Sequence, residues 1–246
     1  MKGVILAGGT GSRLFPLTKV TNKHLLPVYN KPMIYYPIEC MVRAGIQQVL
    51  LVTGGNNSGD FIRLLGNGRA FGLENLQYTY QENAGGIAEA LALAEHFAEK
   101  EPICLILGDN IVEYAIKDCA RRFEQQGTGA KILLSQVQNP SAYGVAEMKG
   151  DQVVRIVEKP KEPKSNWAVI GIYFFDGQVF DIVHTLKPSA RNELEITDVN
   201  NAYIQRGQMT ADKLSGWWAD AGENIDFYLQ ACNRVAQSGA NKEPQG

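Results

Sequence analysis

The stretch KGVILAGGTGSR, residues 2–13, decides the fold that the sequence predicts. Its first six residues form a short apolar run that is typical of a buried strand, and a glycine-rich loop follows at once. Gly8, Gly9 and Gly11 leave backbone N–H groups open to a ligand, which is how many loops bind phosphate oxygens. A tight turn between strand and helix, without any ligand, is the alternative interpretation of these residues.

Two familiar phosphate-binding loops are excluded by the residues that follow Gly11. A Walker loop needs Gly-Lys-Ser/Thr, whereas Gly11 is followed by Ser12 and Arg13. A dinucleotide-binding fingerprint needs a glycine where the chain has Leu14, and Pro16 discourages a long helix that begins at the loop. The segment is therefore either another kind of anion loop or a turn.

The charges around the loop favour the anion-binding alternative. No acidic residue precedes Glu39 in the chain. The same segment holds five cations, namely Lys2, Arg13, Lys19, Lys23 and Lys31. Unopposed cations beside a glycine loop suit a ligand with several negative charges, such as a nucleoside triphosphate. A solvated basic face is the other interpretation of the same charges.

The composition is typical of a soluble α/β protein. The 246 residues are 45% hydrophobic and 20% charged, which is enough for one large core. The formal net charge of −2 provides no global basic field for nucleic acid, so any anion must be bound locally. Four scattered cysteines favour reduced thiols in the cytoplasm over disulfides or a zinc site. No apolar run is long enough for a signal peptide or a membrane span, so we expect no membrane partner.

Apolar runs alternate with helical patterns in the first half of the chain. Strands are predicted at residues 2–7, 47–53, 76–81 and 103–107, with helices over 34–42 and 87–98. This alternation predicts a doubly wound, mostly parallel, Rossmann-like α/β sheet. Ligands of such sheets bind at the carboxyl ends of the strands.

The second half has a different pattern. An inserted antiparallel hairpin is predicted from strands at 145–148 and 153–158, and a further strand at 167–175. Helices are predicted at 178–186, 195–205 and 224–236. The polar residues 238–246 are expected to form a frayed tail.

Two aspartates are candidate magnesium ligands. Asp109 follows the apolar run ICLIL, at the end of a strand where a sheet opens to solvent. Magnesium is typically held by one or two carboxylates together with substrate phosphates and water. Asp109 is otherwise a turn residue or a helix N-cap. Asp220, in GWWADAG, is either the second ligand or a cap for the helix near Asn224, and its two tryptophan neighbours are expected in walls and core.

The stretch EKPKEP, residues 158–163, closes the predicted hairpin. It is typical of a charged surface turn. Its first two residues, Glu158 and Lys159, could also offer an acceptor for sugar hydroxyls and a point charge for a phosphate.

Taken in order, the motifs resemble those of one enzyme family. They are LAGGTGSRLFPLT, NKHLLPV, LGDN, YGVAE, VEKPKEPKSNWAV, ARNELEITDVN and WWADAG. They are similar to motifs of the sugar-1-phosphate nucleotidyltransferases, most closely of the short-form glucose-1-phosphate thymidylyltransferase branch. The base-binding segment QENAGGIAEA and His24, where many relatives have glutamine, depart from the common pattern.

The resemblance implies a role for each matching residue. Arg13 and Lys23 would be catalytic, and Asp109 and Asp220 would bind Mg²⁺. The nucleotide would be bound by Gly8, Gly9, Thr10, Gly11, Ser12, Gln81 and Gly86. The sugar phosphate would be bound by Tyr143, Gly144, Glu158, Lys159, Val169 and Arg191.

The same resemblance implies a single nucleotidyltransferase domain over residues 1–246. Its nucleotide-binding part would span about 1–138, its sugar-binding part about 139–222, a C-terminal helix about 223–237 and a polar tail 238–246. The chain ends without the C-terminal extension of longer members and without a β-helix segment. A cytoplasmic homo-oligomer is expected, because family members commonly assemble in this way.

The activity that the resemblance implies is Mg²⁺-dependent transfer from dTTP to glucose 1-phosphate. The products would be dTDP-glucose, used in deoxysugar polysaccharide synthesis, and pyrophosphate. The sugar phosphate would attack the α-phosphate directly and in line. The alternatives are the same reaction with UTP, CTP or another hexose 1-phosphate, and a non-catalytic sensor of nucleotide sugars.

Overall fold

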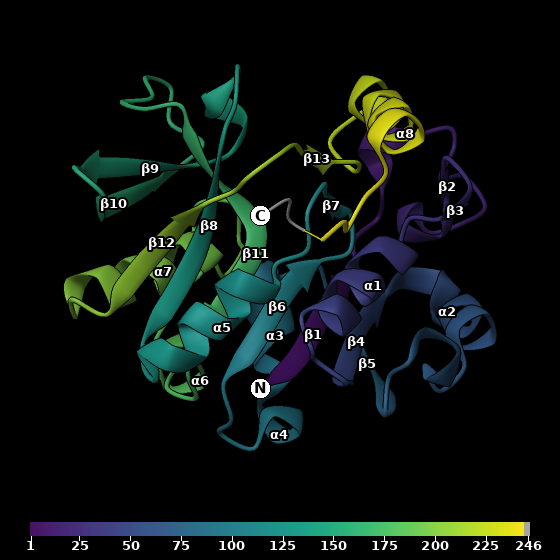
Figure 1. The fold of residues 1–246 in the computed structure, drawn as a ribbon, viewed down its shortest axis with the longest axis horizontal. Coiled ribbons are helices and arrows are strands. Elements are labelled where there is room, and N and C mark those ends of the chain that lie inside the picture. Colours follow the sequence, from purple (N-terminus) through teal and green to yellow (C-terminus); the bar gives the residue numbers. More distant parts are fainter. Residues whose placement is uncertain (244–246) are drawn as a thin grey trace. The chain divides into compact units, whose positions relative to one another are not determined.

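The computed structural model describes residues 1–243, which form two compact units (Figure 1). We call the first the amino-terminal unit; it comprises Lys2–Ala84, Ile106–Ala120 and the chain from Ser215 onward. The second, the hairpin unit, comprises Met1, Gly85–Leu105 and Arg121–Leu214. Strand β6 (Ile103–Leu107) and helix α5 (Lys117–Gln126) each begin in one unit and end in the other.

Three parallel strands form the sheet of the amino-terminal unit (Figure 1). They are β1 (Lys2–Ala7), β4 (Gln48–Gly54) and β5 (Asn75–Gln81), in the order β1-β4-β5. All residues of β1 are buried, which explains the apolar run Val4–Ala7 that follows Lys2 and Gly3. The register pairs Ala7 with Thr53 and Gly54 with Gln81, so the carboxyl ends of the three strands lie together.

Shorter elements complete this unit. The helices are α1 (Tyr35–Arg43), α2 (Ser58–Leu65) and α8 (Ile225–Ser238). Two short antiparallel pairs are β2 (Pro27–Val28) with β3 (Lys31–Pro32), and β7 (Asn110–Val112) with β13 (Trp218–Asp220). Trp218 is buried and Trp217 packs against a buried cluster, as expected for walls and core.

The hairpin unit holds a mixed sheet. Its strands are β8 (Ala130–Gln136), β9 (Gly144–Lys149), β10 (Gln152–Glu158), β11 (Trp167–Phe175) and β12 (Met209–Lys213). β9 and β10 form the antiparallel hairpin, β11 pairs antiparallel with β8, and β12 pairs parallel with β8. The helices are α3 (Ile87–Ala92), α4 (Glu95–Ala98), α6 (Val179–Val183) and α7 (Ile196–Gln205).

The predicted α/β class, with a parallel sheet and an inserted antiparallel hairpin, is confirmed. The helix predicted over 87–98 is instead two short helices, α3 and α4, separated at Leu93 and Ala94. An alanine-rich segment has little periodicity to mark such a break. The helix predicted over 178–186 ends at Val183, where the Thr185 hydroxyl donates to the Ile182 carbonyl and Pro188 follows.

The expectation of a frayed tail is wrong for residues 239–243. Asn241 is 1% exposed, and its N–H donates to the Val112 carbonyl at 2.9 Å. Its side-chain Nδ2 donates to the Tyr36 carbonyl at 2.9 Å, which offsets part of the cost of burying the amide, whereas its Oδ1 has no partner among the described residues. Residues 244–246 of the predicted tail lie outside the described residues. Between residues 1 and 243, no helix combines the length and apolarity needed to cross a bilayer.

Candidate active site

The glycine-rich loop begins where β1 ends. Gly9 and Gly11 have φ angles of 91° and 63°, a left-handed backbone that side chains rarely adopt. The Thr18 hydroxyl donates to the Gly11 carbonyl at 2.8 Å and closes the loop. Gly9, Thr10 and Ser12 are exposed, so their backbone is open to a ligand. Gln81, at the end of β5, reaches Gly8: a Cβ there would lie 3.3 Å from the Gln81 Oε1.

The prediction of five unopposed cations is wrong for Arg13, Lys23 and Lys31, each of which has a carboxylate partner. Lys31 Nζ lies 2.5 Å from a carboxylate oxygen of Glu39. Arg13 Nη1 lies 2.5 Å from Glu223 Oε2, although these residues are 210 positions apart. Lys23 forms an ion pair with Asp109, and Lys2 is buried in β1. Later parts of the chain supply the carboxylates that the first segment lacks.

Asp109 and Asp220 are brought together by the pairing of β7 with β13. The register places Asp220 opposite Asn110, and the Ala221 N–H donates to the Asp109 carbonyl at 2.9 Å. Asn110 holds the Asp109 carboxylate through a side-chain hydrogen bond of 3.0 Å. Gly222 allows the close approach: a Cβ at this position would lie 2.3 Å from the Asp109 Oδ2.

The two carboxylates have opposite pKa shifts. Burial raises the pKa of Asp220 to about 7, and the negative charge of Asp109 adds to the shift. Burial also disfavours the charged form of Asp109, but the Lys23 ammonium outweighs it and holds that pKa below its usual range. Two carboxylates that repel each other, one buried and one half-buried, are a suitable pair of ligands for a divalent cation, which would relieve the repulsion.

Asp220 does not cap the helix near Asn224. The Asn224 side chain does so, accepting a hydrogen bond from the Phe227 N–H at 3.0 Å. Asp220 instead accepts from the Gly222 N–H at 2.9 Å, in the turn that leads into α8. Asp109 is likewise a turn residue between β6 and β7, and it caps no helix.

Within the described residues, no cluster of three or more His, Cys, Asp and Glu side chains forms a metal site.

His24 is a buried neutral ring beside Lys23. Burial lowers its pKa to about 3, and the neighbouring Lys23 charge contributes. Its Nδ1 lies 2.7 Å from the Asn22 Oδ1, and its ring leaves no room for a side chain at Gly108. His24 therefore fixes the turn that carries Lys23 against the end of β6.

In the hairpin unit, four of the predicted sugar-phosphate residues lie together. Gly144 pairs with Glu158 at the open end of the hairpin, and the Lys159 N–H donates to the Tyr143 carbonyl at 3.0 Å. Lys159 is exposed and has a φ of 42°. The Thr197 hydroxyl donates to Glu158 Oε2 at 2.7 Å and fixes that carboxylate.

Arg191 is held mainly by Glu195. Its Nη2 lies 2.7 Å from Glu195 Oε2 and 3.5 Å from Glu158 Oε1. The hydrogen bond to Glu195 raises the pKa of Arg191 further above its usual value. Val169 is buried in β11, and Gly86 precedes α3 in the hairpin unit, whereas Gln81 belongs to the amino-terminal unit.

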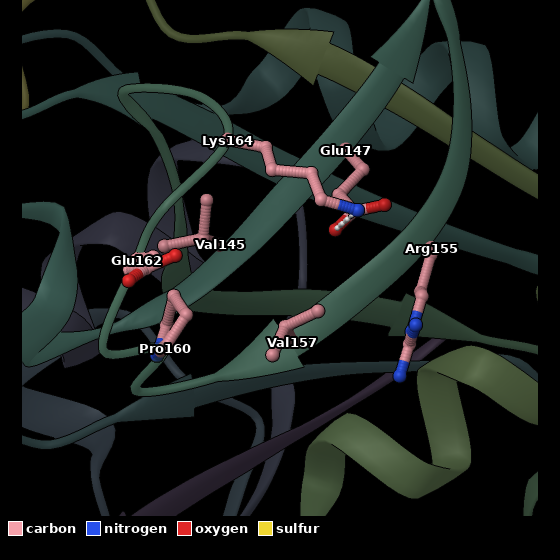
Figure 2. Close-up of a pocket in the computed structure, with 7 residues that line it drawn as sticks. All are labelled: Val145, Glu147, Arg155, Val157, Pro160, Glu162 and Lys164. Atoms are coloured by element: carbon pink, nitrogen blue, oxygen red, sulfur yellow. Dashed lines mark ion pairs between the residues drawn. The ribbon is translucent and has the colours of Figure 1, made fainter.

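A pocket of about 210 Å³ lies on the hairpin, beneath the loop that follows it (Figure 2). Val145 and Glu147 of β9 line it, and Lys164 from the loop pairs with Glu147 at 3.2 Å. Side chains alternate between the two faces of a strand, so this pocket lies on the face opposite Gly144 and Glu158. None of the predicted sugar-phosphate residues is among the described residues that line it.

Several residues that shape these sites were not identified from the sequence. Glu223, Thr197 and Glu195 hold Arg13, Glu158 and Arg191 respectively. Glu223 lies three positions after Asp220, and the other two lie in the motif ARNELEITDVN. Proximity to a motif was the available signal, but it does not show which side chain each residue contacts.

Comparison with known proteins identifies close relatives. The family model described as nucleotidyl transferase matches residues 2–238. A glucose-1-phosphate thymidylyltransferase of Neisseria meningitidis is 43% identical over 235 residues, which cover 94% of this chain and 81% of the relative. One of Mycolicibacterium smegmatis is 46% identical over 239 residues, which cover 96% and 82%.

Solved structures share the fold. A Bacillus anthracis protein, described as a candidate glucose-1-phosphate thymidylyltransferase in complex with a sucrose, has a TM-score of 0.92 and 48% identity. The match covers 96% of each chain. A UDP-glucose pyrophosphorylase complexed with UDP-glucose has a TM-score of 0.84 and 25% identity, covering 96% of this chain and 98% of the other.

Proposed function

Because this chain belongs to the nucleotidyl transferase family, we propose that it transfers a thymidylyl group from dTTP to glucose 1-phosphate. The observation that carries the proposal is the pair of the buried Asp109 and the half-buried Asp220, with Lys23 bound to the first, in the unit that holds the glycine loop. The relatives named glucose-1-phosphate thymidylyltransferase support this choice of substrates. The products are dTDP-glucose and pyrophosphate.

The chemistry depends on electrostatics and positioning. The attacking oxygen of the sugar phosphate is already an anion, so the reaction needs no general base. The obstacle is repulsion between two polyanions, together with the charge that develops on departing pyrophosphate. Arg13 and Lys23 neutralise charge at the α-phosphate and on the departing pyrophosphate, and the backbone of residues 8–12 binds the triphosphate. Asp109 and Asp220 would hold Mg²⁺, which would supply further positive charge to the triphosphate.

Each substrate has its own group of residues. Gln81 and Gly86 bind the base. The hexose contacts Tyr143, Gly144, Glu158 and Val169. Lys159 and Arg191 bind the phosphate of the sugar 1-phosphate and aim its oxygen at the α-phosphate. In-line attack exchanges one P–O bond for another without a covalent enzyme intermediate.

A second candidate keeps the chemistry and changes the base. The similarity to a UDP-glucose pyrophosphorylase makes UTP the first alternative to dTTP. CTP in place of dTTP, and another hexose 1-phosphate in place of glucose 1-phosphate, are the remaining alternatives. A non-catalytic sensor of nucleotide sugars is disfavoured, because Arg13, Lys23 and both aspartates are present.

Pyrophosphate release tests both the reaction and the base. The purified chain is incubated with Mg²⁺, glucose 1-phosphate and, in turn, dTTP, UTP, CTP, ATP and GTP. We expect the largest kcat/KM with dTTP. Faster release with UTP would change the base assignment, and no release with any triphosphate would leave only the sensor.

We further propose that the enzyme works in the cytoplasm as a homo-oligomer. Its product would supply deoxysugar units of the rhamnose type for polysaccharide synthesis. Light scattering of the purified chain measures the oligomeric state directly.

A further inference from the structure

Glu223 is a charged residue without a part in the proposed chemistry. Its Oε2 lies 2.5 Å from the Nη1 of Arg13, which we assign to the triphosphate. The Glu223 side chain is 20% exposed, whereas that of Arg13 is 56% exposed. The two form an ion pair beside the glycine loop, at the place where a phosphate would need the guanidinium.

The backbone of Glu223 is held firmly. The Gly222 N–H donates to the Asp220 carboxylate at 2.9 Å, immediately before Glu223. Asn224, immediately after it, caps α8 through the Phe227 N–H. Side-chain hydrogen bonds therefore fix the residues on both sides of Glu223, just before the 14-residue helix α8.

Arg13 has the freer side chain of the two. Its backbone belongs to a short 3₁₀ turn, Ser12–Leu14, in which the Leu14 N–H donates to the Gly11 carbonyl at 3.0 Å. Its guanidinium, in contrast, lies on a long side chain that is more than half exposed. When the ion pair breaks, the arginine side chain therefore has more room to turn toward a ligand than the glutamate has.

We propose that Glu223 is a built-in competitor of the nucleoside triphosphate for Arg13. This inference rests on the proposed function, in which Arg13 binds phosphate. Carboxylate and phosphate oxygens present the same geometry to a guanidinium, so either can occupy it. An exposed ion pair is worth little, so a triphosphate with several charges displaces the carboxylate. Glu223 then repels the bound phosphates, weakens triphosphate affinity and favours release of pyrophosphate.

Calorimetric titration with dTTP and Mg²⁺, in the absence of sugar phosphate, tests the competition. We expect Glu223→Gln to bind dTTP about threefold to fivefold more tightly than the unmodified chain. The matched control is Asp60→Asn, which removes the carboxylate partner of Arg63 in the same unit and changes the net charge equally. This control should bind dTTP as the unmodified chain does.

Steady-state kinetics separate competition from a structural role. In Glu223→Gln, the KM for dTTP and the inhibition constant of pyrophosphate should fall together, without a rise in kcat. A loss of folding would instead lower kcat and leave these constants unchanged or raised. Glu223→Ala, as a second variant without the carboxylate, should show the same gain in affinity.

Each outcome decides between the two proposals. If the unmodified chain binds dTTP but both variants bind it equally or more weakly, the competition is wrong and the proposed function stands. If the unmodified chain binds no triphosphate, the proposed function is wrong and the competition with it.

Discussion

Asp109 and Arg13 provide the sharpest tests among single side chains. Asp109→Asn removes a charge that both Lys23 and the proposed Mg²⁺ require, and Arg13→Ala removes a donor at the α-phosphate. A preorganised electrostatic contact is typically worth about 3–4 kcal/mol in a transition state. We therefore expect either change to lower kcat at least ~100-fold in the pyrophosphate-release assay.

Two comparisons make that result interpretable. Circular dichroism shows whether each variant is folded, which matters because Asp109 is buried. Asp60→Asn, a change at a half-exposed position in α2, should retain full activity. A folded Asp109→Asn or Arg13→Ala variant with nearly normal kcat would remove that residue from the mechanism.

Among the elements, Asp176 joins several parts of the hairpin unit. It follows β11 and accepts hydrogen bonds from the Gly129 N–H at 2.6 Å and the Tyr203 hydroxyl at 2.7 Å. Burial would raise the pKa of Asp176, but the hydrogen bonds from Gly129, Tyr203 and Thr128 outweigh it and lower that pKa. The charged form is therefore the one that stabilises the fold. We expect Asp176→Asn to lower the free energy of unfolding by about 2–3 kcal/mol at pH 7.

The loss of unfolding free energy in Asp176→Asn should become smaller as the pH falls. A carboxyl whose pKa is lower in the folded state contributes its full stability above its unfolded pKa of about 4. That contribution disappears as the pH falls through the lower pKa of the folded state. Urea unfolding at pH 7, 5, 4 and 3 should thus show a difference between Asp176→Asn and the unmodified chain that shrinks only below about pH 4. A difference independent of pH would contradict a role for the charge.

For the molecule as a whole, substrate and metal should stabilise the fold together. A ligand at about 100 times its Kd adds ~2.7 kcal/mol to the free energy of unfolding. For a chain of this size, that corresponds to a rise in Tm of about 5–10 °C. We expect this shift with dTTP and Mg²⁺ in a thermal melt, and little shift after EDTA is added.

Asp220→Asn is the matched variant for the melt, because it removes one proposed metal ligand. It should show a much smaller Mg²⁺-dependent shift than Asp60→Asn. If dTTP raises Tm equally with and without EDTA, the two aspartates do not bind the metal that the triphosphate needs.

Local patterns in the sequence predicted much of the fold. The continuous apolar runs at 2–7, 103–107 and 167–175 match β1, β6 and β11 residue for residue. Elements with a weaker pattern, such as β12 and α2, were not identified. β12 reads MTADK and is half-exposed, so its pairing with β8 rather than its own composition makes it a strand.

The amino-acid order was sufficient to predict the α/β class and the glycine loop after β1, and to select two aspartates as candidate magnesium ligands. These features depend on apolar continuity and on residue types that are neighbours in the chain. The ion pairs of Arg13 with Glu223 and of Lys23 with Asp109 arise only in the folded chain, across 210 and 86 positions. Their formation depends on the pairing of β7 with β13 and on where α8 begins. The entropic cost of closing a loop grows only slowly with its length, so residues this far apart in the chain can still pair. A local pattern therefore predicts the cations and Asp109, but not which carboxylate pairs with which cation.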